Sequence, residues 1–191
     1  VSRPKPAQAD ASPVARAGHD LLACSRTGSG KTAAFRLTLW HGLIGKPRGT
    51  TRALVLTPTR ELAAQIVEDL NDLAVHTPLT AAAVFGGVGM GPQEHAFRSG
   101  VDVIVATPGR LLDHFRSQYA KLGSLQYLVL DEADRMLDMG FLPDIRRVLK
   151  HIPPPAKRQT LFFSATMQPP IAHLSKWMLK APGETTHNTR G

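Results

Sequence analysis

The residues from Ser25 to Thr32 read SRTGSGKT, a glycine-rich stretch of a kind that binds phosphate. It fits the pattern G-x-x-x-x-G-K-S/T, except that Ser25 stands at the first glycine position. In such a loop, backbone N–H groups and the positive end of the next helix face the phosphates. We expect Lys31 to reach the β- and γ-phosphates and the Thr32 hydroxyl to hold Mg²⁺. The alternative is a Gly/Ser turn with a lysine by chance. The predicted nucleotide-binding residues are Ser25, Arg26, Thr27, Gly28, Ser29, Gly30, Lys31 and Thr32.

An acidic pair, Asp131 and Glu132, follows the apolar run 128–130. A P-loop enzyme needs a carboxylate at the end of a neighbouring strand to hold its metal ion, and we assign this role to Asp131. Glu132 is then placed to orient or deprotonate the attacking water as a general base. By itself an acidic pair after a strand is usually a solvated loop, so the phosphate-loop pattern is what favours catalysis. Lys31, Asp131 and Glu132 are therefore the predicted catalytic residues.

The acidic pair continues as DEAD (131–134), and with this motif the sequence resembles the DEAD-box family of ATP-dependent RNA helicases. The stretches 134–141 and 161–164 look especially similar to bacterial members. The resemblance extends from about Pro4 to Pro182 and implies an N-terminal RecA-like domain with ATP or ADP and Mg²⁺ as cofactors. The other family motifs occur in the family's order as PTRELA (58–63), GG (86–87), TPGR (107–110) and SAT (164–166).

The resemblance also implies a face that binds single-stranded or duplex RNA. The matching positions in the family contact the sugar-phosphate backbone, which has little sequence information, so binding is expected to be nonspecific for sequence. Arginine pairs with phosphate, while glycine and threonine let backbone N–H and hydroxyl groups approach. Two structural alternatives stay open, because Arg60 could pair with a carboxylate and Arg110 could cap its own helix. The RNA-binding residues implied are Arg60, Gly87, Thr107, Gly109 and Arg110.

Adenine recognition and coupling are likewise implied by the resemblance. Gln8 matches the glutamine that reads adenine in the family, a task suited to a carboxamide because it has both a donor and an acceptor. The residues around Gln8 depart from the family pattern. Asp134, Ser164 and Thr166 match positions that link ATP hydrolysis to strand separation, with Ser164 and Thr166 hydrogen-bonding the segment 131–134. A Ser-Ala-Thr sequence after a strand is otherwise usually a helix cap.

Short apolar runs alternate with segments of helical character along the chain. Such runs suit strands that are buried on both faces, as in a parallel sheet covered by helices. Leu62, Ile66 and Leu70 recur at helical spacing and predict a crossover helix from about Glu61 to Val75. The predicted fold is α/β, a RecA-like P-loop domain with a doubly wound, mainly parallel sheet and helices on both faces. The expected strands are 20–24, 53–56, 81–85, 101–105, 127–130 and 160–163.

The domain is expected to cover residues 1–182, with 183–191 as a flexible tail or linker because that segment has no apolar residue. DEAD-box helicases have a second RecA-like domain whose arginines stabilise charge on the γ-phosphate, and nothing after the SAT motif matches it. We therefore expect nucleotide binding, weak RNA binding and little turnover from this chain alone. A noncatalytic RNA- or partner-binding module is one alternative, which the retained Lys31 and Glu132 disfavour. Another P-loop enzyme, such as a DNA helicase, is disfavoured by the DEAD and TPGR motifs.

The composition is that of a globular protein with a basic surplus. The 23 lysines and arginines exceed the 15 acidic residues, which gives a net charge of +8 and favours a polyanionic partner such as nucleic acid. A solubilising surface explains this charge equally well. Cys24 is the only cysteine, which excludes an internal disulfide, and its apolar neighbours predict a buried thiol. Without a membrane-spanning run or a signal peptide in the sequence, we expect a cytoplasmic protein.

Overall fold

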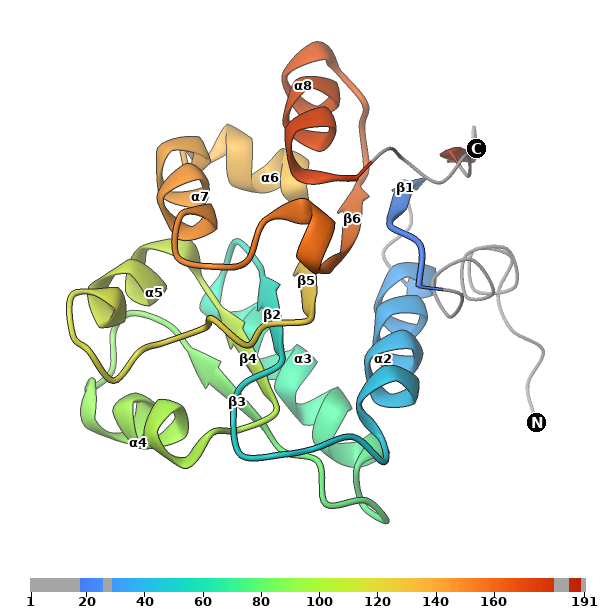
Figure 1. Cartoon of the computed structure of the whole chain (residues 1–191). Coiled ribbons are helices and arrows are strands. Elements are labelled where there is room, and N and C mark those ends of the chain that lie inside the picture. Colours follow the sequence, from blue (N-terminus) through green and yellow to red (C-terminus); the bar gives the residue numbers. More distant parts are fainter. Residues whose placement is uncertain (1–17, 26–28, 181–185, 190–191) are drawn as a thin grey trace.

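The computed structural model describes residues 18–25, 29–180 and 186–189, which are built around one sheet (Figure 1). The strands lie in the order β3-β4-β2-β5-β6-β1-β7, and each pair of neighbours is parallel. The predicted α/β architecture is therefore confirmed. The strands are β1 (Leu21–Ser25), β2 (Ala53–Leu56), β3 (Ala81–Val84), β4 (Val103–Ala106), β5 (Tyr127–Leu130), β6 (Gln159–Ser164) and β7 (Thr186–Thr189).

The six predicted strands are all present, and β7 is a strand that the sequence did not predict. It lies inside the segment 183–191, which we expected to be a tail or linker. β7 pairs with β1 from Leu22↔Thr186 to Ser25↔Thr189. A polar sequence such as THNT shows no apolar alternation, but an edge strand can pair through its backbone alone. This difference from the prediction therefore has a physical reason.

Helices cover both faces of the sheet, and each face has its own apolar core. The strands are buried on both sides, so successive residues contribute to opposite cores. In β2, for example, Leu54 and Leu56 pack on one face, while Ala53 and Val55 pack on the other. The first face is covered by α4 (Gly91–Ser99), α5 (Pro108–Phe115), α6 (Ala133–Asp138), α7 (Leu142–Leu149) and α8 (Pro169–Met178), and the second by α2 (Ser29–Leu43) and α3 (Arg60–Leu73).

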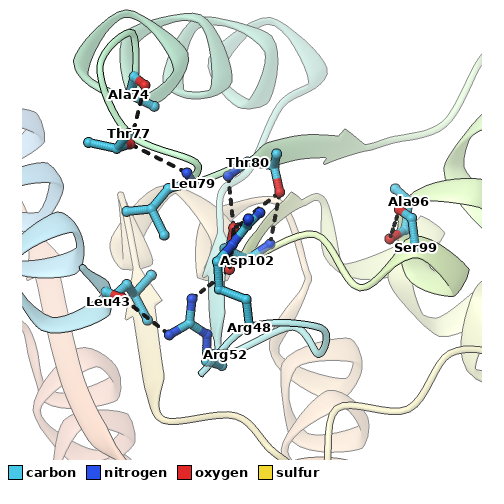
Figure 2. A network of polar contacts seen from close by, with 10 residues as sticks. All are labelled: Leu43, Arg48, Arg52, Ala74, Thr77, Leu79, Thr80, Ala96, Ser99 and Asp102. Carbon is cyan, nitrogen blue, oxygen red and sulfur yellow. Dashed lines mark hydrogen bonds and ion pairs between the residues drawn. The ribbon is translucent and has the colours of Figure 1, made fainter. Parts of the chain in front are cut away.

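The amino edge of the sheet is fixed by a buried carboxylate, Asp102, which lies just before β4 (Figure 2). Its Oδ1 accepts from Arg52 Nη2 at 2.5 Å, and its Oδ2 accepts from Arg48 Nη2 at 3.1 Å. The same Oδ2 accepts from the backbone N–H of Thr80 at 2.9 Å. Since Arg52 precedes β2 and Thr80 precedes β3, one carboxylate ties together the starts of three strands.

A second buried aspartate, Asp20, does the same for the other half of the sheet. It precedes β1 and accepts from the backbone N–H of Thr160 in β6 at 2.8 Å and from that of Lys180 after α8 at 2.7 Å. Within β1, Cys24 is buried, as its apolar neighbours predicted. The amino edge therefore stabilises the fold, and a binding site is expected at the opposite edge.

Candidate functional site

The predicted site residues gather at the carboxyl edge of the sheet. Because the strands are parallel, the segments that leave β1 to β6 all emerge along this edge. Among the described residues, they are Ser25 at the end of β1 with residues 29–32, Arg60 after β2, Gly87 after β3, residues 107–110 after β4, residues 131–134 after β5 and residues 164–166 at the end of β6.

The described backbone around the predicted phosphate loop has the arrangement that the motif requires. β1 ends at Ser25 and α2 begins at Ser29, so residues 29–32 form the first turn of α2. The N–H groups of a first helical turn have no partner within the helix and suit an anion. No acidic residue stands in this turn to oppose a phosphate. The predicted residues Gln8, Arg26, Thr27 and Gly28 lie outside the described residues.

The acidic pair lies at a sharp bend between β5 and α6. Asp131 is buried, and its backbone N–H donates to Leu56 O at 2.9 Å, which extends the pairing of β5 with β2. Glu132 has φ 54° and ψ 52°, and among the described residues it is the one non-glycine with positive φ. A left-handed conformation costs a residue with a Cβ about 1–2 kcal/mol. Such strain clusters at functional sites, because it turns a side chain where regular structure would not.

The Glu132 carboxylate stays accessible at this bend. Its side chain is 34% exposed, and its Oε2 lies 3.3 Å from Nη1 of Arg135, which is itself 53% exposed. An ion pair this exposed is weak, so it leaves the carboxylate free to accept a proton or orient a water. Asp134, three residues into the motif, lies half-buried in the first turn of α6.

Two buried hydroxyls lie in the strands on either side of β5. Ser164 ends β6, and Thr57 directly follows β2. Both residues are 0% exposed, and neither Oγ has a hydrogen-bond partner in the part of the chain that the structure describes. The predicted hydrogen bond from Ser164 to the segment 131–134 is therefore not formed in this structure, and Thr166 is exposed. Leaving a buried hydroxyl unpaired costs about 1–3 kcal/mol.

Thr57 is a candidate that sequence reasoning missed. The signal for it was available, because Thr57 follows a buried strand directly, as Asp131 does. The PTRELA motif begins one residue later, at Pro58, and so does not include Thr57. Like the Ser164 hydroxyl, the Thr57 hydroxyl has no hydrogen-bond partner within the described residues, so a ligand could supply one.

Arg60 and Gly87 are brought together by the fold. Arg60 opens α3, and its guanidinium lies 5.3 Å from the ring centroid of Phe85. Gly87 has φ +84°, and a Cβ at this position would lie 2.8 Å from Arg60 Nη1. The absence of a side chain is thus what lets the arginine cross the turn. Among the described residues, no carboxylate lies within ion-pair distance of Arg60, so the structural alternative for Arg60 finds no support.

Thr107, Gly109 and Arg110 lie at the start of α5. Thr107 occupies the N-cap position without a side-chain capping bond, and Gly109 is exposed in the first turn. Arg110 is mostly buried, with its side chain 14% exposed, and its Nη1 donates to Val88 O at 2.9 Å. Its Nε lies 3.8 Å from Asp113 Oδ2 in the same helix. Arg110 therefore has a structural role as well, since it joins α5 to the turn after β3.

The sequence pattern of the DEAD/DEAH box helicase family matches residues 5–174. The chain belongs to the DEAD/DEAH box helicase family. The resemblance of the individual motifs is thus confirmed over most of the sequence, and the matched part corresponds to the N-terminal RecA-like domain of DEAD-box helicases.

DEAD-box relatives occur in plants and bacteria alike. The chain is 44% identical over 189 residues to "DEAD-box ATP-dependent RNA helicase 52A" of Oryza sativa, covering 90% of this chain and 31% of the relative. It is 42% identical to "ATP-dependent RNA helicase CshA" of Listeria monocytogenes, covering 93% of this chain and 34% of the relative. It is 42% identical to "ATP-dependent RNA helicase RhlB" of Salmonella paratyphi A, covering 89% of this chain and 42% of the relative. The chain thus spans less than half the length of these helicases.

A solved structure supports the same DEAD-box fold. The crystal structure of a hypothetical ATP-dependent RNA helicase from Sulfolobus tokodaii superposes with a TM-score of 0.85 at 32% identity. The match covers 98% of this chain and 54% of that one. In the part of the DEAD-box chain that the structure describes, no helix is long and apolar enough to cross a membrane.

Proposed function

We propose that this chain is the ATP-binding half of a DEAD-box RNA helicase, which couples Mg-ATP binding and hydrolysis to local unwinding of RNA. The observation that supports this most is the placement of two turns at the carboxyl edge. The first turn of α2 follows β1, and the bend at Glu132 follows β5, and both strands are neighbours of β6. The anion-binding helix start and the acidic pair therefore lie one strand apart.

The nucleotide chemistry would be divided among four residues. Lys31 would contact the β- and γ-phosphates, and Thr32 with Asp131 would hold Mg²⁺, which neutralises charge on the phosphates. Glu132 would accept a proton from the attacking water. The described residues contain no group of three His, Cys, Asp or Glu side chains able to hold a metal ion. A single carboxylate such as Asp131 suits Mg²⁺, which is usually held by one or two carboxylates together with phosphate oxygens.

RNA would cross the same edge over β2, β3 and β4. Arg60 lies exposed above Gly87, and the start of α5 offers the N–H groups of Gly109 and its neighbour to a phosphate. These contacts recognise the backbone, so the RNA sequence should matter little. Within the whole helicase, a second RecA-like domain would complete the site, and this chain alone would bind RNA weakly and turn ATP over slowly.

The test is to titrate the chain with Mg-ADP and, separately, with a fluorescent single-stranded RNA. We expect Lys31→Ala to weaken ADP binding at least about tenfold, because one charge-assisted phosphate contact is lost, and to leave RNA binding unchanged. Arg60→Ala should do the reverse and reduce the salt slope of RNA binding by about 0.7, the value of one phosphate contact with a single strand. Arg116→Ala, which removes an exposed arginine at the other end of α5, is the matched control and should change neither.

The same titrations discriminate between the proposed function and its alternatives. RNA binding without any ADP binding would favour a noncatalytic module. Equal affinity for single-stranded DNA of the same sequence would favour a different P-loop enzyme, because only RNA has the 2′-hydroxyl groups that these contacts should recognise.

A further inference from the structure

A buried chain of polar side chains lies beneath the proposed RNA face. Gln93 in α4 is 6% exposed, and His114 in α5 is fully buried. Gln93 Oε1 lies 2.8 Å from His114 Nε2, and His114 Nδ1 lies 2.5 Å from the hydroxyl of Tyr119. At its other end, Gln93 Nε2 donates to Phe85 O at 2.8 Å. Its Oε1 also accepts from Arg110 Nη1 at 3.4 Å.

The donors and acceptors in this chain are fixed by elimination. Phe85 O can only accept, so the amide nitrogen of Gln93 must face it and the amide oxygen must face His114. That oxygen can only accept in turn, which places a proton on His114 Nε2. A neutral ring then accepts from the Tyr119 hydroxyl at Nδ1. Every polar atom of the Gln93 amide that faces the interior is therefore paired.

Burial, together with the charge of Arg110, keeps the ring of His114 neutral. Burial lowers the pKa of His114, and the charge of Arg110 lowers it further, while Asp113 and Glu94 act in the opposite direction with less effect. Arg98 lies over the ring of Tyr119, 5.2 Å from its centroid, and is the other cation on this side. The hydrogen-bond pattern deduced above is thus the stable one at neutral pH.

These hydrogen-bonded side chains connect two motifs of the proposed RNA face. Phe85 directly precedes Gly86 and Gly87, while Arg110 ends the TPGR motif. A single amide side chain bonds to both segments, and Arg110 itself donates to Val88 O just beyond the glycines. The distance between the glycine turn and the start of α5 therefore depends on Gln93.

We propose that Gln93, held by His114 and Tyr119, is a positioning residue that sets the spacing between the Gly86–Gly87 turn and Arg110 for RNA binding. This inference rests on the proposed function of these two motifs. A purely structural network would stabilise the domain without affecting RNA, and the experiment has to separate the two.

The experiment compares two substitutions of buried glutamines by methionine, which keeps the length of the side chain and removes its hydrogen bonds. Gln93→Met disrupts the network. Gln159→Met is the matched control, because Gln159 in β6 is also buried, and its Nε2 donates to His19 O at 2.9 Å at the amino edge. The affinity for a single-stranded RNA is measured at several salt concentrations, together with the thermal midpoint of unfolding.

We expect Gln93→Met to weaken RNA binding about tenfold and to reduce the salt slope by about 0.7, as one phosphate contact is lost. Gln159→Met should lower the thermal midpoint to a similar degree and leave RNA binding unchanged. Gln93→Glu should not recover the affinity, because a carboxylate still accepts from Arg110 and His114 but has no N–H to donate to Phe85 O. Tyr119→Phe is the milder change, because it removes only the hydroxyl that supports His114. It is the variant to measure if Gln93→Met does not fold, and it should weaken RNA binding by about threefold.

Equal RNA affinity and salt slope in wild type, Gln93→Met and Tyr119→Phe would overturn the positioning role while leaving the proposed function intact. Loss of RNA binding in Gln159→Met as well would also overturn it, because general destabilisation would then be the cause. A wild-type chain that binds no RNA at all would refute the proposed function itself, and the positioning role with it.

Discussion

Glu132 is held in a backbone conformation that its side chain disfavours. Its φ of 54° costs about 1–2 kcal/mol relative to glycine, which adopts this region freely. We therefore expect Glu132→Gly to raise the free energy of unfolding by about 1 kcal/mol, even though it removes the proposed base. Glu132→Gln should leave stability unchanged, because it keeps the Cβ. Chemical denaturation of the three proteins measures both effects.

A glutamate in ordinary helical conformation provides the control for this prediction. Glu68 is exposed in the middle of α3, so Glu68→Gly should lower the free energy of unfolding by about 1 kcal/mol. The opposite signs at positions 68 and 132 would show strain at the acidic pair. If both glycine variants were destabilised alike, Glu132 would be unstrained in solution and the bend would have another origin.

The residues of the candidate site were predictable from the sequence, whereas their hydrogen bonds were not. The phosphate-loop pattern and the acidic pair indicated Asp131 and Glu132, and the family resemblance implied Arg60. All three lie at the carboxyl edge. Motif spacing contains no information about hydrogen bonds, which is why the unpaired Ser164 hydroxyl and the structural bonds of Arg110 had to come from the structure. The basic surplus likewise did not distinguish a nucleic-acid partner from a solubilising surface.

At the scale of secondary-structure elements, the Asp102 anchor is the feature that holds the amino edge together (Figure 2). Asp102 is 0% exposed and binds Arg52, which is 2% exposed, and Arg48. Removing one partner of such a buried ion pair leaves an uncompensated charge, which costs about 3–5 kcal/mol. We expect Asp102→Asn to lower the free energy of unfolding by that amount. Asp69→Asn, at a partly exposed pair with Arg36 in which the N–O distance is 3.6 Å, should cost about 0–1 kcal/mol.

The pH dependence of stability tests the same anchor. Burial raises the pKa of Asp102, but hydrogen bonds from Arg48, Arg52 and Thr80 outweigh it and leave the pKa below that of an ordinary aspartate. The stabilisation is therefore complete above the unfolded pKa of about 3.9 and is lost as the pH falls through the lower folded value. Asp102→Asn should remove part of the acid-induced loss of stability. An unchanged acid profile would mean that other carboxylates dominate it.

Strands with continuous apolar runs were predictable from the sequence. A strand that forms through backbone pairing alone was not. Strands buried on both faces, such as β2 and β5, have apolar residues throughout and coincide with the prediction. β7 has none, so its pairing with β1 had no signal in the sequence. The burial of Arg52 and Arg158, which are 2% and 4% exposed, was not predicted either, because arginine side chains are mostly exposed in proteins.

For the whole molecule, the two edges of the parallel sheet separate the buried anchors of the fold from the residues of the proposed site. Asp20 and Asp102 fix the starts of the strands at the amino edge through hydrogen bonds and ion pairs. The carboxyl edge holds the strained Glu132, the unpaired hydroxyls and the exposed Arg60. The hydroxyls of Thr57 and Ser164 lack hydrogen-bond partners within the described residues, which is what a site completed by a nucleotide, RNA or another domain should show.

The last prediction concerns what completes that surface. We expect ATP turnover by this chain to be slow with or without single-stranded RNA, because in DEAD-box helicases a second RecA-like domain supplies the arginines that stabilise charge on the γ-phosphate. Fusing a second RecA-like domain to its C-terminus should raise RNA-stimulated turnover by on the order of 10³ to 10⁵, the contribution of arginine fingers. In the fused protein, Glu132→Gln should return turnover to the level of this chain alone, whereas Glu68→Gln should not. Fast RNA-stimulated turnover by the 191 residues alone would contradict the requirement for a second domain, and undiminished turnover in the Glu132→Gln fusion would remove Glu132 as the base.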